Sequence, residues 1–207
     1  MINYAQHSIS AKDIKAVQKT LKSKFITQGK KVFEFEKKLK TICNSKYAVT
    51  VNSATSALHI TCLGLEIGKG DIVWTSPNSF VASSNCALLS GAKVDFVDIE
   101  MRTFNICPEK LEKKLKISKK KGKLPKAIIL VHFAGHPCNL EKIYKLSKTF
   151  NFNIIEDASH AIGAKYKNTK IGDCKFSDAT IFSFHAAKII TTGEGGLIVT
   201  NKKKYFD

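Results

Sequence analysis

The chain has 207 residues, of which 43% are hydrophobic, and a formal net charge of +17. A chain of this length and composition can bury a core, which argues against intrinsic disorder. It contains no run of about 20 apolar residues, the length that spans a bilayer, and residues 1–15 contain no apolar segment of the secretory type. We therefore expect a cytoplasmic globular protein with no membrane partner.

The excess of positive charge suggests one alternative, a non-catalytic module that binds nucleic acid or another polyanion. Among the 34 basic residues only Arg102 is an arginine, the residue type that contacts phosphate and guanine through two parallel hydrogen bonds. The densest basic run, KKLKISKKKGKLPK (113–126), contains no aromatic residue to stack on a base. We expect solvated lysines and no nucleic-acid partner, with the polyanion-binding module kept as the alternative.

Six cysteines are spread at wide and irregular spacings, and no C-x-x-C pair occurs. Metal sites built from cysteine need closely spaced ligand pairs, and disulfides are rare in the cytosol. We expect free, buried thiols and no metal. The six residues are Cys43, Cys62, Cys86, Cys107, Cys138 and Cys174.

The first 45 residues predict two amphipathic helices. Ser10 and Asp13 resemble a capping box at the start of a helix that extends to about Phe25. The segment KKVFEFEKKLKTIC (30–43) predicts a second helix. The residues expected to face inward from it are Val32, Phe35 and Leu39.

From residue 47 onward, strand-like and helical segments alternate. Strands are expected at 47–51, 71–76, 93–99, 127–133 and 152–157, followed by a pair at 179–184 and 195–201. Helices are expected at 53–65, 80–90, 108–116 and 140–150. This alternation predicts an α/β fold, with a mostly parallel sheet covered by helices on both faces. The continuous apolar run at 127–133 fits a strand buried on both sides.

Two segments place polar groups after strands, where ligands gather in open α/β sheets. In VNSATSALHI (51–60), Thr55 and Ser56 open a helix, whose free N–H groups bind phosphate or carboxylate; the alternative is simple helix capping. In FNIIEDASHAIGA (152–164), Asp157 ends a buried strand and His160 follows. A buried carboxylate needs a partner, such as a metal, a histidine or a protonated ligand nitrogen; capping a helix is the alternative.

Two further segments carry an aromatic ring and an amine. Phe80 begins a helix after a strand, and it either stacks on a planar ligand or belongs to the core. Lys188, in FSFHAAKIITTGEGG (182–196), lies between an apolar strand and a glycine-rich turn. Desolvation there would lower the pKa of the amine, which suits Schiff-base chemistry; an ordinary surface lysine is the alternative.

A phosphate cradle, an aspartate for a ring nitrogen, a stacking ring and a buried lysine are together what pyridoxal 5'-phosphate (PLP) requires. The segments NSATSALH, GAKVDFVDI, IIEDASHAIGA and FSFHAAKIITTGEGG resemble fold type I PLP-dependent enzymes, and among them the DegT/DnrJ/EryC1/StrS family of sugar aminotransferases. The resemblance covers residues 1–207. It implies the N-terminal part of the family's PLP-binding large domain, with the small C-terminal domain absent.

The resemblance also implies roles for individual residues. Lys188 matches the PLP-binding lysine, which also acts as general base and acid. Asp157 matches the partner of the pyridine nitrogen, His160 the residue beside the ring hydroxyl, and Phe80 the stacking ring. The implied phosphate ligands are Thr55, Ser56 and Ser183. The role of His185 in the same turn stays open.

The implied reaction transfers an amino group from an amino acid, by resemblance L-glutamate, to C4 of a UDP-linked 4-keto-6-deoxy-N-acetyl hexose in nonulosonic (pseudaminic) acid biosynthesis. Sugar 3-dehydratases of the family carry histidine where this chain has Lys188, which favours transamination. Family members are longer, and we expect a homodimer at full length. An inactive fragment of the aminotransferase is a further alternative.

Overall fold

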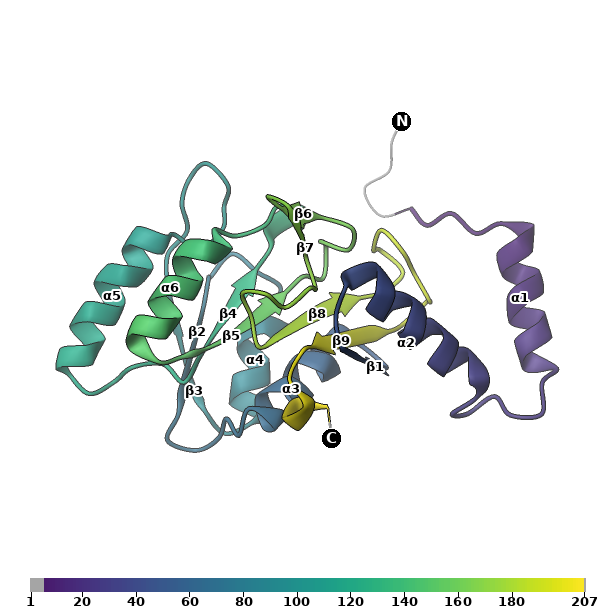
Figure 1. Ribbon diagram of the computed structural model, residues 1–207, viewed down its shortest axis with the longest axis horizontal. Coiled ribbons are helices and arrows are strands. Elements are labelled where there is room, and N and C mark those ends of the chain that lie inside the picture. Colours follow the sequence, from purple (N-terminus) through teal and green to yellow (C-terminus); the bar gives the residue numbers. More distant parts are fainter. Residues whose placement is uncertain (1–5, 207) are drawn as a thin grey trace.

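The computed structural model describes residues 6–206, which form a seven-stranded sheet flanked by helices (Figure 1). Residues 1–5 and 207 of the predicted domain lie outside the described residues. The helices are α1 (Ala11–Leu21), α2 (Lys30–Cys43), α3 (Ala54–Gly64), α4 (Ala82–Leu89), α5 (Pro108–Lys120) and α6 (Leu140–Phe150), with short 3-10 turns at Phe133–Gly135 and Lys203–Tyr205. The strands are β1 (Tyr47–Val51), β2 (Ile72–Thr75), β3 (Lys93–Phe96), β4 (Ala127–Val131), β5 (Asn153–Asp157), β6 (Lys165–Tyr166), β7 (Thr169–Lys170), β8 (Ala179–Ser183) and β9 (Gly196–Thr200).

The strand order in the large sheet is β1-β9-β8-β5-β4-β2-β3. The run from β8 through β5, β4 and β2 to β3 is parallel, whereas β9 pairs antiparallel with both β8 and β1. Parallel neighbours need a crossover. Helices provide it between β2, β3, β4 and β5, whereas the segment from β5 to β8 contains the short pair β6–β7 and no helix. The predicted α/β class with a mostly parallel sheet is confirmed. The short antiparallel pair β6–β7 was not predicted, because two-residue strands carry no hydrophobic period.

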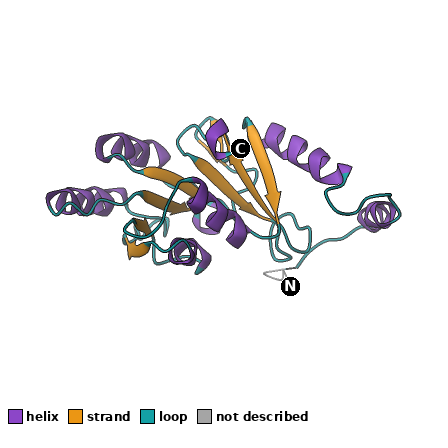
Figure 2. Ribbon diagram, turned by 90° about the horizontal axis from the view of Figure 1, so that it is seen from below, coloured by secondary structure: helices purple, strands orange, loops and turns teal. Residues whose placement is uncertain are grey.

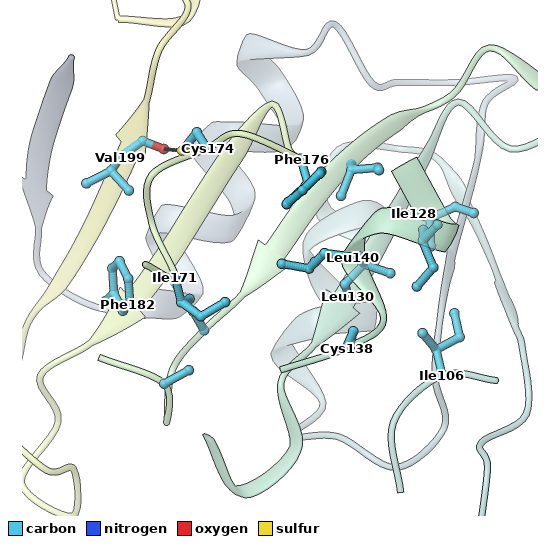
Figure 3. Packing of buried hydrophobic residues seen from close by; sticks show 14 of the residues in the cluster. Ile106, Ile128, Leu130, Cys138, Leu140, Ile171, Cys174, Phe176, Phe182 and Val199 are labelled. Carbon is cyan, nitrogen blue, oxygen red and sulfur yellow. Dashed lines mark hydrogen bonds between the residues drawn. The ribbon is translucent and has the colours of Figure 1, made fainter. Parts of the chain in front are cut away.

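Helices cover both faces of the sheet, and each face has its own core (Figure 2). The larger core packs α5 and α6 against alternate strand residues such as Ile128, Leu130 and Phe182, some of which are drawn in Figure 3. The smaller core packs α3 and α4 against the intervening residues, such as Ile129 and Ile155. Successive side chains of a strand point to opposite faces, so each central strand contributes to both cores.

The N-terminal helices depart from the predictions in detail. The capping box of Ser10 and Asp13 is confirmed, but α1 ends at Leu21 and does not reach Phe25. Figure 1 shows α1 standing away from the sheet, and none of its residues is buried. In α2, Leu39 is buried as predicted, whereas Val32 is exposed, because the first turn of α2 extends beyond the edge of the core.

The cysteine prediction is confirmed, since all six cysteines are free and buried. Within residues 6–206, no group of three or more histidine, cysteine or acidic side chains is arranged to hold a metal ion. No helix in this range is both long enough and apolar enough to span a membrane.

Candidate active site

Asp157 lies at the carboxyl end of β5, on the sheet face that carries α3 and α4, and its side chain is buried. Its Oδ2 accepts a hydrogen bond from Ser83 Oγ at the start of α4, 2.6 Å away. Its Oδ1 accepts from Ser159 Oγ at 2.6 Å and from the Ser159 N–H at 3.2 Å. Three donors therefore fix the carboxylate. Within the described residues it forms no ion pair, so a cationic ligand group would be a favourable partner.

The loop 184–195 joins β8 to β9 and carries Lys188. Backbone hydrogen bonds between Phe184 and Gly195 and between Phe184 and Thr192 close the loop at its base. From there the Lys188 Nζ reaches His160, whose Nε2 lies 2.6 Å away. Lys188 is half-buried, neither as buried as its apolar flanks suggested nor a free surface lysine.

The pKa of both partners is depressed. Burial lowers the pKa of Lys188, and the negative charge of Asp157 opposes part of that effect. Burial also lowers the pKa of His160, as does the positive charge of Lys188, with Asp157 again opposing. A neutral imidazole that accepts a hydrogen bond from the amine is consistent with both shifts. The structure thus brings Lys188, His160 and Asp157 together at one edge of the sheet.

The predicted phosphate ligands also converge. Ser53 caps α3 by accepting the Ser56 N–H at 3.1 Å, so Thr55 and Ser56 lie in the first turn of that helix. Ser183 ends β8 and is paired in register with Gly196, the first residue of β9. A methyl group on Gly196 would overlap the carbonyl of Ser53. Gly196 therefore lets β9 approach the start of α3, which places Ser183 beside the helix N-terminus, a suitable place for an anion.

Phe80 precedes α4 and has 75% of its surface exposed. Of the two alternatives for Phe80, the core aromatic is therefore excluded. Neighbouring Ser79 donates to the Phe80 carbonyl at 3.1 Å, and its Oγ lies 2.7 Å from that of Ser83, which holds Asp157. The Phe80 backbone is thus held next to the serine that contacts Asp157, and its exposed ring stays a candidate for ligand stacking.

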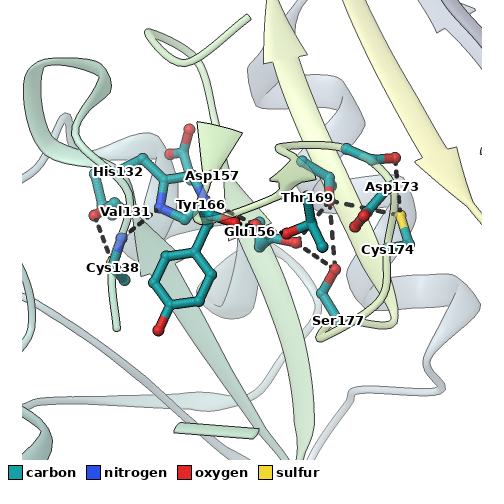
Figure 4. Close-up of polar contacts among 12 residues, drawn as sticks. Val131, His132, Cys138, Glu156, Asp157, Tyr166, Thr169, Asp173, Cys174 and Ser177 are labelled. Carbon is teal, nitrogen blue, oxygen red and sulfur yellow. Dashed lines mark hydrogen bonds and ion pairs between the residues drawn. The ribbon is translucent and has the colours of Figure 1, made fainter. Parts of the chain in front are cut away.

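A buried polar cluster behind the site was not predicted (Figure 4). His132, which follows β4, and Glu156 on β5 are both buried, and Nε2 of His132 lies 2.8 Å from Oε2 of Glu156. The other carboxylate oxygen accepts from Ser177 and from Thr180 Oγ1, the latter at 2.9 Å. Burial opposes ionisation of Glu156, yet the contacts with His132 and the hydroxyls lower its pKa. One signal of this cluster was present in the sequence, because Glu156 is a charged residue within an apolar strand.

The basic run of 113–126 forms no base-stacking surface. Its lysines border a cavity of about 440 Å³ between α5 and the β2–β3 side of the sheet. The Trp74 ring at the base of this cavity is 1% exposed, and the Nζ of Lys114 lies 4.7 Å from its centroid. The one aromatic ring of the cavity is therefore covered and offers no face to a base.

Comparison with known proteins decides between the alternatives. Residues 7–207 match the model of the DegT/DnrJ/EryC1/StrS aminotransferase family. The chain belongs to this family. Its members are PLP-dependent sugar aminotransferases, so the comparison favours the aminotransferase over the non-catalytic polyanion-binding module.

The DegT/DnrJ/EryC1/StrS relatives include characterised proteins. The UDP-4-amino-4,6-dideoxy-N-acetyl-beta-L-altrosamine transaminase of Campylobacter jejuni subsp. jejuni serotype O:23/36 is 45% identical over 205 residues, covering 99% of this chain and 52% of that protein. Helicobacter pylori PseC, an aminotransferase involved in pseudaminic acid biosynthesis, has a TM-score of 0.89 at 38% identity, over 99% of this chain and 53% of PseC. Spr1654 of Streptococcus pneumoniae in its PLP-form has a TM-score of 0.86 at 32% identity, over 100% of this chain and 54% of Spr1654. The chain thus spans about half the length of these relatives.

The residues present fit the family's cofactor. The donor set supplies a primary amine with a lowered pKa, a buried carboxylate without an ion-pair partner among residues 6–206, and a helix N-terminus beside a serine hydroxyl. An amine, a carboxylate and a helix N-terminus are the kinds of group that can bind the aldehyde, the ring nitrogen and the phosphate of PLP.

Proposed function

We propose that this chain provides the cofactor-binding part of a sugar aminotransferase, and that it uses PLP to move an amino group from an amino acid to C4 of a UDP-linked 4-keto-6-deoxy-N-acetyl hexose. The observation that carries the proposal is the approach of Lys188 Nζ to His160 Nε2 at 2.6 Å, at the same sheet edge as the buried Asp157. Family membership supports the class of reaction.

Each residue has a proposed task. PLP, when bound, supplies an electron-withdrawing ring that stabilises negative charge on the carbon beside the transferred nitrogen. Lys188 binds the cofactor and then holds or moves a proton at that carbon, for which a lowered amine pKa is suited. Asp157, fixed by Ser83 and Ser159, keeps the ring nitrogen positively charged. His160 orients Lys188.

The phosphate and the ring have separate binding groups in this proposal. Thr55 and Ser56 in the first turn of α3, together with Ser183, bind the phosphate. Phe80, exposed at the start of α4, stacks on the ring. Binding the anion at a helix N-terminus adds the favourable field of the helix dipole to these hydrogen bonds.

The substrate and setting are proposed on the relatives. The named C. jejuni transaminase and PseC support a UDP-linked amino sugar of pseudaminic acid biosynthesis. We also propose a homodimer, which would cover exposed apolar side chains of α1 such as Val17 and Leu21. The six free thiols support a cytoplasmic location, where cysteines remain reduced.

The decisive experiment is PLP binding by the purified chain, followed by absorbance and by borohydride reduction with peptide mapping. We expect one reduced pyridoxyl group per chain, on Lys188, and no colour in Lys188→Ala. Lys46→Ala, an exposed lysine near β1, is the control and should bind as the parent does. Stoichiometric labelling that persists in Lys188→Ala would refute the assignment. Amino transfer to the UDP-keto sugar, followed by NMR, then tests the substrate.

A further inference from the structure

The buried cluster of His132 and Glu156 lies on the opposite face of the sheet from Asp157, yet it is joined to Lys188 by a short path. We propose that His132 is a positioning residue for Lys188: its Nδ1 anchors the loop 133–138, while Glu156 holds the ring from the other side, and this loop supports His160, which contacts the lysine amine. This inference rests on the proposed function only in taking Lys188 as the reacting amine.

The first link in the path is the His132 ring itself. The backbone N–H of Cys138 donates to Nδ1 at 3.1 Å, so Nδ1 carries no proton and Nε2 carries the one that faces Glu156. The carboxylate is held in turn by Ser177 and Thr180. Figure 4 shows the ring between Cys138 and Glu156. Each ring nitrogen therefore has a partner: Nδ1 binds the loop backbone at Cys138, and Nε2 faces Glu156 on β5.

The second link is the loop that returns to the ring. Backbone bonds from Gly135 to the His132 carbonyl, at 3.0 Å, and from His136 to Phe133, at 2.9 Å, close it tightly. Asn105 holds it from outside, by donating to the His136 carbonyl and accepting the Phe133 N–H, both at 2.9 Å. The loop therefore has one fixed shape as long as its end at Cys138 stays on the His132 ring.

The third link is the contact between this loop and His160. Gly135 has φ +84°, and a Cβ there would lie 2.5 Å from the carbonyl oxygen of His160. The loop backbone thus packs directly on the backbone of His160, whose Nε2 is 2.6 Å from Lys188 Nζ. The titratable groups that face Lys188 are His160 and Asp157. A shift of the loop would change how deeply the amine is buried.

Two isosteric replacements separate the two roles of the ring. His132→Asn keeps an acceptor at the Nδ1 position for the Cys138 N–H but does not reach Glu156. His132→Gln keeps a donor at the Nε2 position for Glu156 but leaves the Cys138 N–H without its acceptor. Gly135→Ala disturbs the contact with His160 and leaves the buried pair intact. Leu115→Ala, a fully buried residue of α5, serves as a control that destabilises the fold elsewhere.

The readout is the apparent pKa of Lys188 in the cofactor-free chain, from competitive acetic anhydride labelling across pH with mass spectrometry, where the other lysines are internal references. We expect His132→Gln and Gly135→Ala to raise this pKa by about half a unit or more towards its ordinary value, since burial of the amine is lost. His132→Asn and Leu115→Ala should leave it unchanged.

Three results would overturn the inference: an unchanged Lys188 pKa in His132→Gln, an equal shift in His132→Asn, or a shift in Leu115→Ala. If Gly135→Ala does not fold, the contrast between the two His132 variants decides alone. The labelling is carried out without cofactor. A failure of PLP binding would therefore refute the proposed function and leave the labelling result for Lys188 unchanged.

Discussion

The Nζ atom of Lys188 and the Nε2 atom of His160 lie 2.6 Å apart although 28 residues separate them in the chain. The two side chains come from different places, one from the loop after β8 and the other from the turn after β5. Since β5 and β8 are parallel neighbours, their carboxyl ends meet at one edge of the sheet. The contact therefore follows from strand order.

The contact predicts the titration of the amine. His160→Ala removes the ring that shields Lys188, so the apparent pKa of Lys188 should rise towards its ordinary value. Competitive labelling across pH measures the shift. His185→Ala is the matched control, because His185 lies in the same loop but its Nδ1 accepts from Ala187. Equal shifts in both variants would contradict the specific role of His160.

Stability should depend on pH through His160. Its pKa is lower in the folded chain than in the unfolded chain, so the unfolded chain binds the proton first as the pH falls. The free energy of unfolding should therefore decrease as the pH drops from about 6.5, the ordinary histidine value, through the lower folded pKa. Urea unfolding measures this free energy at each pH. Its dependence on pH should differ between the parent and His160→Gln in this window and become the same above it. Parallel curves throughout the window would argue against a depressed pKa.

Asp157→Asn should separate stability from function. In the cofactor-free chain the carboxylate is buried with hydroxyl and N–H donors but without an ion-pair partner among the described residues. The amide keeps an oxygen acceptor for these donors while the buried charge is removed, so the free energy of unfolding should change by less than about 1 kcal/mol. PLP affinity, measured by absorbance titration, should fall. A larger loss of stability in Asp157→Asn would show that the charge itself supports the fold.

Two glycine substitutions should have opposite effects. Gly196→Ala places a methyl group against the Ser53 carbonyl, where rigid backbone on both sides must shift, and should cost about 3 kcal/mol. Gly64, the last residue of α3, has no neighbouring atom within 4 Å of an added Cβ. Gly64→Ala should therefore stabilise the chain by about 0.5–1 kcal/mol through helix propensity. Thermal and urea unfolding measure both, and a tolerated Gly196→Ala would contradict the close approach of β9 to α3.

The order and type of the main elements could be predicted from the sequence, because hydrophobic period and capping signals are local. The helix 140–150 and the strand pair at 179–184 and 195–201 are examples, the pair being antiparallel in the structure. The ends of the elements were predicted less exactly. The first helix was expected to reach about Phe25 but ends at Leu21, because packing as well as local pattern decides how far a helix extends.

The candidate site was predictable in its residue types but not in its geometry. A lysine beside a glycine-rich turn and an aspartate after an apolar strand are local signals. The contact of Asp157 with Ser83 depends on which helix packs beside β5, whereas the contact with Ser159 is local. The contact between Glu156 and His132 could not be predicted either. The two residues are 24 positions apart in the chain, and no local sequence pattern indicates that they meet.

Strand β5 ends in two consecutive carboxylates, Glu156 and Asp157, that point to opposite sides of the sheet. Inserting or deleting a single residue within this strand would exchange their places: Asp157 would face the larger core, and Glu156 would face α3 and α4. Length changes in β5 should therefore be absent from functional variants.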